Sequence, residues 1–418
     1  MINTLRATAF FPKGWIPTVL ILGLSAAAFS QDSNSPFGMC INMGSAEATE
    51  QAAEWAVPIG VKWMRQDFAW YAIEPERGKF QWGRLDAIVD VGLKHGISTL
   101  GIVTYAPSWI GHDPSTDEER ELFANFVYQT VLHFKGRIQY WEIWNEPNIG
   151  TFWKPRPNAS DYGNALKAAY QAAKRADPNC KILGICTLAI DAPFIERVLA
   201  EGAIDYFDIL SVHPYRDLRD IDLNKDLPDV DLIDDLQEVR RLMAKYGPVK
   251  PIWITEMGRN TSLAPEGEGI SEEAQANYSV KMYVVAFAGG VEKFFQYHLK
   301  EGGEDPYYTE HHYGVLRKDW SPKPSYFAVG TLIKKITRLK CIGNVLADDK
   351  QARGYLFSNA DSSVLVLWAV GGTVEVNLPV GISELRLTDR EGRERAIYTP
   401  EGIVKLTLTE SPVYLEGF

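Results

Sequence analysis

Eight short apolar segments recur between residues 36 and 337, and segments of helical periodicity separate them. Each is short and rich in β-branched and aromatic residues, which predicts a buried strand rather than a helix. The expected strands are Phe37–Asn42, Val61–Phe68, Ser98–Tyr105, Ile138–Trp144, Lys181–Thr187, Phe207–Val212, Pro251–Thr255 and Lys293–Tyr297. Eight strands, each followed by a helix, predict a (β/α)₈ TIM barrel, which needs about 250 residues. The fold class expected for residues 31–337 is therefore α/β.

The segments between the strands show the three- and four-residue spacing of an amphipathic helix. One such set is Leu122, Phe123, Phe126, Val127, Val131 and Phe134, and another is Leu232, Leu236, Val239 and Met243. A doubly wound open sheet would also alternate strands with helices. However, no glycine-rich dinucleotide fingerprint follows the first strand, so the closed barrel is favoured.

Residues 338–418 follow a different pattern. Val374, Val376 and Leu378 alternate with polar residues, and so do Val404, Leu406 and Leu408. A period of two, with turn signals at Gly371-Gly372 and at residues 389–392, is typical of antiparallel strands with one buried face. We expect a small C-terminal antiparallel β-sandwich here.

The first 30 residues resemble an export signal. Arg6 and Lys13 are the only charged residues, an apolar run follows from Trp15 to Phe29, and small residues lie near its end. A membrane anchor is the alternative, but Pro17 interrupts the run and leaves it short for a span. We expect cleavage after about residue 30 and an exported protein, periplasmic or secreted.

The formal net charge of −11 argues against a nucleic-acid partner and, after cleavage of the signal, against an anionic membrane, because both require a basic surface. The four cysteines are Cys40, Cys180, Cys186 and Cys341, and their spacing matches no zinc motif. The first three lie in or beside expected strands, which favours buried thiols. An exported protein could also form one disulfide among the four.

Two of the expected strands end in a glutamate. Residues 140–148 read Tyr-Trp-Glu-Ile-Trp-Asn-Glu-Pro-Asn and place Glu146 after the fourth strand; residues 251–258 read Pro-Ile-Trp-Ile-Thr-Glu-Met-Gly and place Glu256 at the end of the seventh. The C-terminal ends of the strands carry the active sites of TIM barrels. Two carboxylates, one protonated and one ionised, are the groups that break a glycosidic bond.

With these motifs the chain resembles clan A of the glycoside hydrolases, and most closely its family 39-like members, over the barrel and the β-domain. The resemblance implies that Glu146 is the acid/base and Glu256 the nucleophile of a retaining enzyme that acts on β-linked oligo- or polysaccharides. Arg65, in Met-Arg-Gln-Asp-Phe, is similar to a second-strand arginine of the clan. His213-Pro214-Tyr215 is similar to its sixth-strand His-x-Tyr pattern.

These residues suggest separate tasks. Arg65 and the hydroxyl of Tyr215 are expected to hold Glu256 ionised and oriented. The negative charge of Glu256 then helps Glu146 to keep its proton. Asn145 is placed to bind the 2-hydroxyl of the sugar, and His213 is expected to contribute to the same site. The double displacement calls for no metal and no organic cofactor.

Aromatic residues near the strand ends could stack on sugar rings, although packing in the core is as good an explanation for any one of them. The candidates are Trp70, Trp109, Trp153, Tyr297, Tyr307 and Trp320, with Trp109 preferred as the wall of a subsite. Many clan members carry a tryptophan at the end of the eighth strand. Here Tyr297 or His298 takes its place, or no residue does. Glu142, deeper in the fourth strand, is expected to be a buried structural carboxylate.

Other interpretations stay open. Glu146 or Glu256 could belong to a buried ion pair of the barrel. A family 5-like endo-β-glucanase or mannanase would have the same two glutamates. A carbohydrate-binding barrel without turnover would keep the fold and part of the motifs. A metal-dependent barrel hydrolase would need a cluster of His and Asp at the strand ends, which the sequence does not show.

Overall fold

The computed structural model describes residues 34–215, 228–264, 269–346, 349 and 351–418. The segment expected to be an export signal, residues 1–30, lies outside this described part. Among the described residues, no helix has the length and apolar character that a membrane crossing requires.

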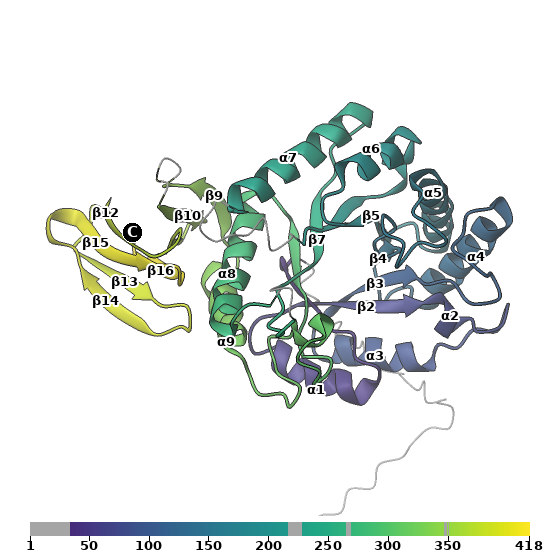
Figure 1. Ribbon diagram of the computed structural model, residues 1–418, viewed down its shortest axis with the longest axis horizontal. Helices are drawn as coiled ribbons and strands as arrows, with labels where there is room; N and C mark the ends of the chain where they lie inside the picture. The colour runs from purple at the N-terminus through teal and green to yellow at the C-terminus, as the bar shows by residue number, and fades with distance from the viewer. Residues whose placement is uncertain (1–33, 216–227, 265–268, 347–348, 350) are drawn as a thin grey trace, which may run out of the picture. The chain divides into compact units, whose positions relative to one another are not determined.

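Eight parallel strands form a closed barrel in sequence order, and several of them are labelled in Figure 1. Strand β1 pairs with β8 and closes the barrel. The strands are β1 Phe37–Cys40, β2 Trp63–Ala69, β3 Ser98–Thr104, β4 Tyr140–Ile143, β5 Lys181–Leu188, β6 Ile209–His213, β7 Ile252–Met257 and β8 Lys293–Gln296. Every boundary lies within two residues of the one predicted from the apolar runs. The (β/α)₈ prediction is confirmed.

Helices connect successive strands on the outside of the barrel. They are α1 Ala46–Ala56, α2 Trp70–Ile73, α3 Gly83–Lys94, α4 Asp117–His133, α5 Ala159–Ala176, α6 Ala192–Ala200, α7 Pro228–Tyr246, α8 Glu272–Ala288 and α9 Pro324–Ile336, with 3₁₀ turns η1 Ala203–Tyr206 and η2 Thr309–His312. Helix α4 shows how the sequence produces one of them. Thr116 and Glu119 form a capping box at its start, and Phe123, Phe126 and Val127 are buried on one face.

A layer of aromatic side chains fills the lower part of the barrel. Trp63 packs edge-to-face on Tyr140 (5.0 Å between ring centroids) and on Trp253 (5.6 Å), and Phe295 joins the same buried cluster. Side chains two residues apart on a strand point the same way. The next inward positions above these aromatics are therefore Arg65, Glu142 and Thr255, and the polar site is built directly on this layer.

Residues 340–416 form antiparallel strands, as predicted. One sheet has the order β14-β13-β16-β11-β10-β9, and β12 pairs with β15. The strands are β9 Lys340–Asn344, β10 Ala352–Ser358, β11 Ser363–Ala369, β12 Thr373–Pro379, β13 Glu384–Thr388, β14 Glu394–Tyr398, β15 Ile403–Thr409 and β16 Val413–Glu416, with the 3₁₀ turn η3 Pro400–Gly402 between β14 and β15. The alternating apolar residues of β12 and β15 face a common core with β11, β13 and β16. A separate domain beginning at residue 338 stays a prediction.

The cysteines carry free thiols in this structure, and Cys40, Cys180 and Cys186 are buried, as expected from their places in or beside strands.

Gly258 lets the end of β7 approach the end of β8. A Cβ atom at this position would lie 1.9 Å from the carbonyl oxygen of Tyr297, which is backbone and cannot move aside cheaply. We expect Gly258→Ala to lower the free energy of unfolding by about 1–3 kcal/mol, as measured by chemical denaturation. The matched control is Gly83→Ala, where nothing lies within 4 Å of the new atom. Equal stability of the two variants would contradict the close approach.

Candidate active site

A cleft of about 1460 Å³ opens at the C-terminal ends of the barrel strands. Side chains from several strand ends line it, as expected for this fold. They include Arg65 and Asp67 of β2, Asn145 and Glu146 after β4, Tyr215 after β6, Glu256 of β7 and Tyr297 after β8. Six of the eight residues predicted for the site, Arg65, Asn145, Glu146, Tyr215, Glu256 and Tyr297, therefore share one cavity.

The chain leaves β4 through an unusual backbone conformation that aims Glu146 into the cleft. Trp144 has φ 70° and Glu146 has φ 43°, in the left-handed region that non-glycine residues rarely adopt. Each such residue costs on the order of 1–3 kcal/mol, so neighbouring contacts must hold it. The Trp144 backbone N–H donates to the carbonyl of Val103 (3.0 Å), and that of Glu146 to the carbonyl of Cys186 (3.0 Å).

Glu146 is 5% exposed, and its Oε1 lies 2.7 Å from Nδ1 of His213. His213 itself is fully buried and lies outside the cleft lining, which corrects the prediction that it contacts substrate. It ends β6 on the inner face of the barrel, beneath Glu146, where Cys186 and Thr255 also contact its ring. Burial alone would lower the pKa of His213, but contact with Cys186 and the charge of Glu256 raise it well above its ordinary value.

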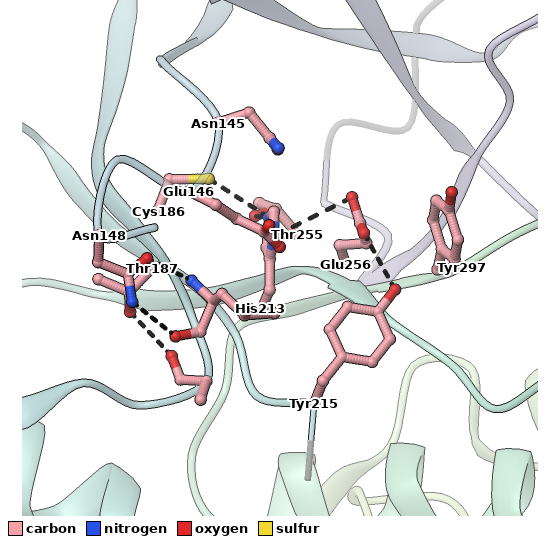
Figure 2. Close-up of polar contacts among 12 residues, drawn as sticks. Asn145, Glu146, Asn148, Cys186, Thr187, His213, Tyr215, Thr255, Glu256 and Tyr297 are labelled. Atoms are coloured by element: carbon pink, nitrogen blue, oxygen red, sulfur yellow. Dashed lines mark hydrogen bonds and ion pairs between the residues drawn. The ribbon is translucent and has the colours of Figure 1, made fainter. Parts of the chain in front are cut away.

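Glu256 accepts two hydrogen bonds. Arg65 Nη1 donates to Oε2 at 2.6 Å, and the Tyr215 hydroxyl donates to Oε1 at 3.0 Å (Figure 2). Burial raises the pKa of Glu256, and the nearby Glu146 adds to this effect, whereas His213, Arg65 and Tyr215 lower it. The net direction is upward. Arg65 and Tyr215 both contact Glu256 and both favour its ionised form, as expected, while burial acts against them.

Arg65 binds three side chains at the floor of the cleft. Besides Glu256, it donates from Nε to Glu142 (2.8 Å) and from Nη2 to Oδ1 of Asn145 (2.9 Å). Burial would raise the pKa of Glu142, but the charges of Arg65 and His213 hold it below its ordinary value. Because Oδ1 of Asn145 is engaged, its NH₂ group is the donor left for a ligand in the cleft.

The carboxylates of Glu146 and Glu256 lie close together. One ligand atom from each of Glu146, His213 and Glu256 falls within 4.8 Å of the other two. Such a set could in principle bind a cation, and so could Glu142, Cys186 and His213. In both sets, however, His213 and the carboxylates already bind one another or Arg65, and the buried guanidinium opposes a second cation. The donors fit a hydrogen-bond network better than a metal.

The predicted aromatic platform is only partly present. Tyr297 lines the cleft, with Tyr313 at 5.2 Å and Tyr215 at 6.3 Å between ring centroids. His298 lines it too, so the substitution of either residue for the clan's tryptophan stays a prediction. Trp109 lies outside the lining, and its role as a subsite wall stays a prediction. Its indole N–H donates to the Glu74 carbonyl (3.1 Å), and its ring packs edge-to-face on Trp70.

The other aromatic candidates are also outside the cleft lining. Trp70 and Trp153 are buried in the core, and Tyr307 and Trp320 lie elsewhere on the loops.

The cleft also contains residues that the sequence analysis missed. Asp67 follows Arg65 by two residues and so faces the same way; its Oδ2 accepts from the Asn42 amide at 2.7 Å. The period of β2 could have revealed it. Glu310 and Tyr313 reach the cleft from the long segment after β8, and Tyr297 donates to Glu310 at 3.0 Å. No periodic pattern in the sequence marks these two.

Removal of Arg65 should leave Glu142 as an uncompensated charge in the barrel. We expect Arg65→Met to lower the free energy of unfolding by about 3–5 kcal/mol. The double variant Arg65→Met/Glu142→Gln should recover part of this loss, because the second change removes that charge. Denaturant unfolding of both variants and of Glu142→Gln completes the cycle. Strictly additive losses would contradict the pairing.

Comparison with known proteins supports this architecture. The sequence model of Glycosyl hydrolase family 10 matches residues 25–184. Endo-1,4-beta-xylanase 3 of Hypocrea jecorina is 24% identical over 157 residues, which are 35% of this chain and 44% of that protein. Endo-1,4-beta-xylanase C of Phanerodontia chrysosporium is 30% identical over 120 residues, 27% of this chain and 30% of that protein. The chain thus spans less than half the length of these curated relatives.

Solved structures match over most of the chain. A family 39 glycoside hydrolase from Bacteroides cellulosilyticus WH2 has a TM-score of 0.76 at 24% identity, covering 91% of this chain and 80% of that one. A GH39 β-xylosidase from Caulobacter crescentus has a TM-score of 0.65 at 18% identity, covering 92% and 96%. The fold is that of family 39, and the comparisons confirm the predicted resemblance of this chain to clan A of the glycoside hydrolases.

Proposed function

We propose that this chain is a retaining glycoside hydrolase that cleaves β-glycosidic bonds of oligo- or polysaccharides. The observation that carries the proposal is the pair Glu146 and Glu256, which present carboxylate oxygens within 4.8 Å of each other in a cleft at the strand ends. Retaining enzymes hold their two carboxyl groups about 5–5.5 Å apart, whereas inverting enzymes need about 6.5–9.5 Å to admit a water molecule between them and the sugar.

The contacts of the two glutamates suggest which does what. Glu256 is bound by a guanidinium and a phenol, which stabilise it as a carboxylate and as a leaving group. It is the nucleophile: it attacks the anomeric carbon while Glu146 gives a proton to the departing oxygen. In the second step Glu146 takes a proton from water, and the water oxygen displaces Glu256. The NH₂ group of Asn145 is placed to bind the sugar 2-hydroxyl.

The names of the matched proteins indicate which sugar to test first. Curated relatives are named endo-1,4-β-xylanases, and one matched structure is named a β-xylosidase. We therefore propose β-linked xylose as the first substrate to test, followed by β-glucans and mannans. Faster cleavage of a glucan or mannan would support a family 5-like specificity. Export by residues 1–30 would bring the enzyme to such polymers. A binding barrel without turnover would retain these ligands and release no product.

Loss of either carboxylate should remove activity without unfolding the protein. We expect Glu146→Gln to reduce turnover of a substrate with a poor leaving group by about 10²–10⁴-fold, and Glu256→Gln to abolish turnover of every glycoside. The control is Glu292→Gln, at the opposite end of the barrel, where the residue accepts a hydrogen bond from Trp253. Turnover is measured on an aryl-glycoside panel. Near-wild-type rates in either site variant would remove the proposed mechanism.

Azide should distinguish the two roles. In Glu256→Ala, azide can enter the space of the missing nucleophile and displace the leaving group once, which gives a glycosyl azide of inverted configuration. In Glu146→Ala, azide attacks the glycosyl-enzyme and gives the retained product. Proton NMR of the two azides reads the configuration. Exchange of the two outcomes would reverse the assignment.

The short gap between the carboxylates predicts retention of configuration. The first sugar released from a β-aryl glycoside should be the β-anomer, seen by NMR before mutarotation. An initial α-product would show that water attacks directly. It would refute the double displacement while leaving hydrolysis itself in place.

A further inference from the structure

A chain of four hydrogen-bonded side chains lies beneath the cleft. It runs from Glu142 through Thr255 and His213 to Glu146, and so joins β4, β7 and β6 (Figure 2 shows the last three). We propose that the Thr255 hydroxyl, oriented by Glu142, holds a hydrogen on Nε2 of His213, so that Nδ1 faces Glu146 and prepares it to donate its proton. The role at Glu146 rests on the proposed function. Thr255 is a positioning residue, because it acts through His213.

The direction of the first bond follows from Glu142. Its carboxyl group is fully buried, and Arg65 donates to Oε2 at 2.8 Å. The charge of Arg65 helps to hold the pKa of Glu142 below its ordinary value despite burial, so both oxygens act as acceptors. The Thr255 hydroxyl lies 2.7 Å from Oε1 of Glu142 and must donate to it.

The direction of the second bond follows from the first. A hydroxyl has one hydrogen, and that of Thr255 is used by Glu142. Toward Nε2 of His213, 3.1 Å away, Thr255 can only accept. Nε2 therefore carries a hydrogen. Cys186 agrees with this assignment: its sulfur lies 3.3 Å from Nε2, and burial raises the pKa of its thiol, so it is a neutral, weak acceptor.

The other ring nitrogen faces Glu146. Nδ1 lies 2.7 Å from Oε1, and with Nε2 protonated, the hydrogen between Nδ1 and Oε1 is shared by the ring and the carboxyl group. Oε2 is then the oxygen left for the substrate, and in the free enzyme it carries the separate proton by which Glu146 acts as an acid. When Oε2 gives its proton to the leaving oxygen, an Nδ1–H donated to Oε1 stabilises the carboxylate that forms. In the second step Oε2 takes a proton from water, and His213 keeps its own throughout.

Other charged and titratable groups also face His213, and they set its protonation together. They come from every strand packed against it and are Arg65 on β2, Glu142 and Glu146 on or after β4, Cys186 on β5, and Glu256 on β7, whose Oε2 lies 4.0 Å from Nδ1. None of these groups contacts both Nε2 of His213 and Oε1 of Glu142, as the Thr255 hydroxyl does. Of the contacts at Nε2, the hydroxyl is the oxygen acceptor, and its own hydrogen is already committed to Glu142.

The first test separates acid catalysis from structural damage. Two aryl glycosides of one sugar are compared, one with a dinitrophenyl group that leaves without a proton and one with a phenyl group that needs it. We expect Thr255→Val to reduce kcat/KM for the phenyl glycoside by about 10–100-fold and to affect the dinitrophenyl glycoside far less. Thr255→Ser, which restores the hydroxyl, should recover the phenyl activity.

Thr187→Val is the matched control. Thr187 is also fully buried at a neighbouring strand end, but its hydroxyl donates to the carbonyl of Ala189 at 2.8 Å and not to the network of His213. Its substitution should leave the ratio between the two substrates unchanged. Equal losses on both glycosides in Thr255→Val, or no loss on either, would overturn the role proposed for Thr255.

The second test needs no turnover. In the full chain labelled with ¹⁵N-histidine, the ring signals of His213 are identified among the seven histidines by their absence from His213→Asn. We expect a protonated Nε2 in the wild type and a changed ring state in Thr255→Val. An unprotonated Nε2 in the wild type would overturn the hydrogen-bond directions. A protein that cleaves no glycoside but shows the protonated Nε2 would refute the proposed function and leave the network intact.

Discussion

The buried guanidinium of Arg65 is the interaction on which the site depends. One side chain, 5% exposed, binds Glu142, Glu256 and the amide oxygen of Asn145 through three different nitrogens. The rigid fork of arginine makes this possible, and lysine could not reproduce it. Taking these charges out of water is costly, so the arrangement is poor evidence for stability. Its effect is on position, because the carboxyl group of Glu256 and the amide of Asn145 are both held by the same guanidinium.

The barrel supports this anchor from below. Trp63, Tyr140 and Trp253 pack as rings inside the lower barrel, and two residues further along the same strands come Arg65, Glu142 and Thr255. Because side chains two residues apart face the same way, a polar and charged layer lies directly above the aromatic layer. This upper layer forms the floor of the cleft. The left-handed backbone at Trp144 and Glu146 is stored strain at the next level up, held by the carbonyls of Val103 and Cys186.

The features that follow from local periodicity could be predicted from the sequence. The eight strands, the antiparallel C-terminal sheets and the placing of Glu146 and Glu256 at strand ends depend on patterns of a few residues. The side-chain partners of His213 could not be predicted in this way. Whether a strand-ending histidine faces the cleft or lies beneath a carboxylate depends on neighbours from three other strands. The contacts of Trp109 could not be predicted for a similar reason, since a loop tryptophan near a strand end can pack on Trp70 as well as on a ligand.

The places of Glu310 and Tyr313 could not be predicted from the sequence, because the segment after β8 shows no periodic pattern of apolar residues. Its path over the cleft depends on tertiary contacts such as the hydrogen bond from Tyr297 to Glu310. Asp67 was within reach. It shares the inward face of β2 with Arg65, and the strand period alone would have identified it.

The aromatic layer has one more consequence. Since the rings of Trp63, Trp253 and Phe295 fill the barrel under the carboxylates, the cleft is closed at its bottom, and substrate and water enter from the side of the strand ends. At the proposed reaction centre, the leaving group and water then use the same side of the cleft, one after the other. In the proposed double displacement, the departing part of the sugar chain leaves before water attacks the glycosyl-enzyme. Any other hydroxyl compound present there competes with water for the same opening, so this geometry leaves room for building new linkages as well as for breaking them.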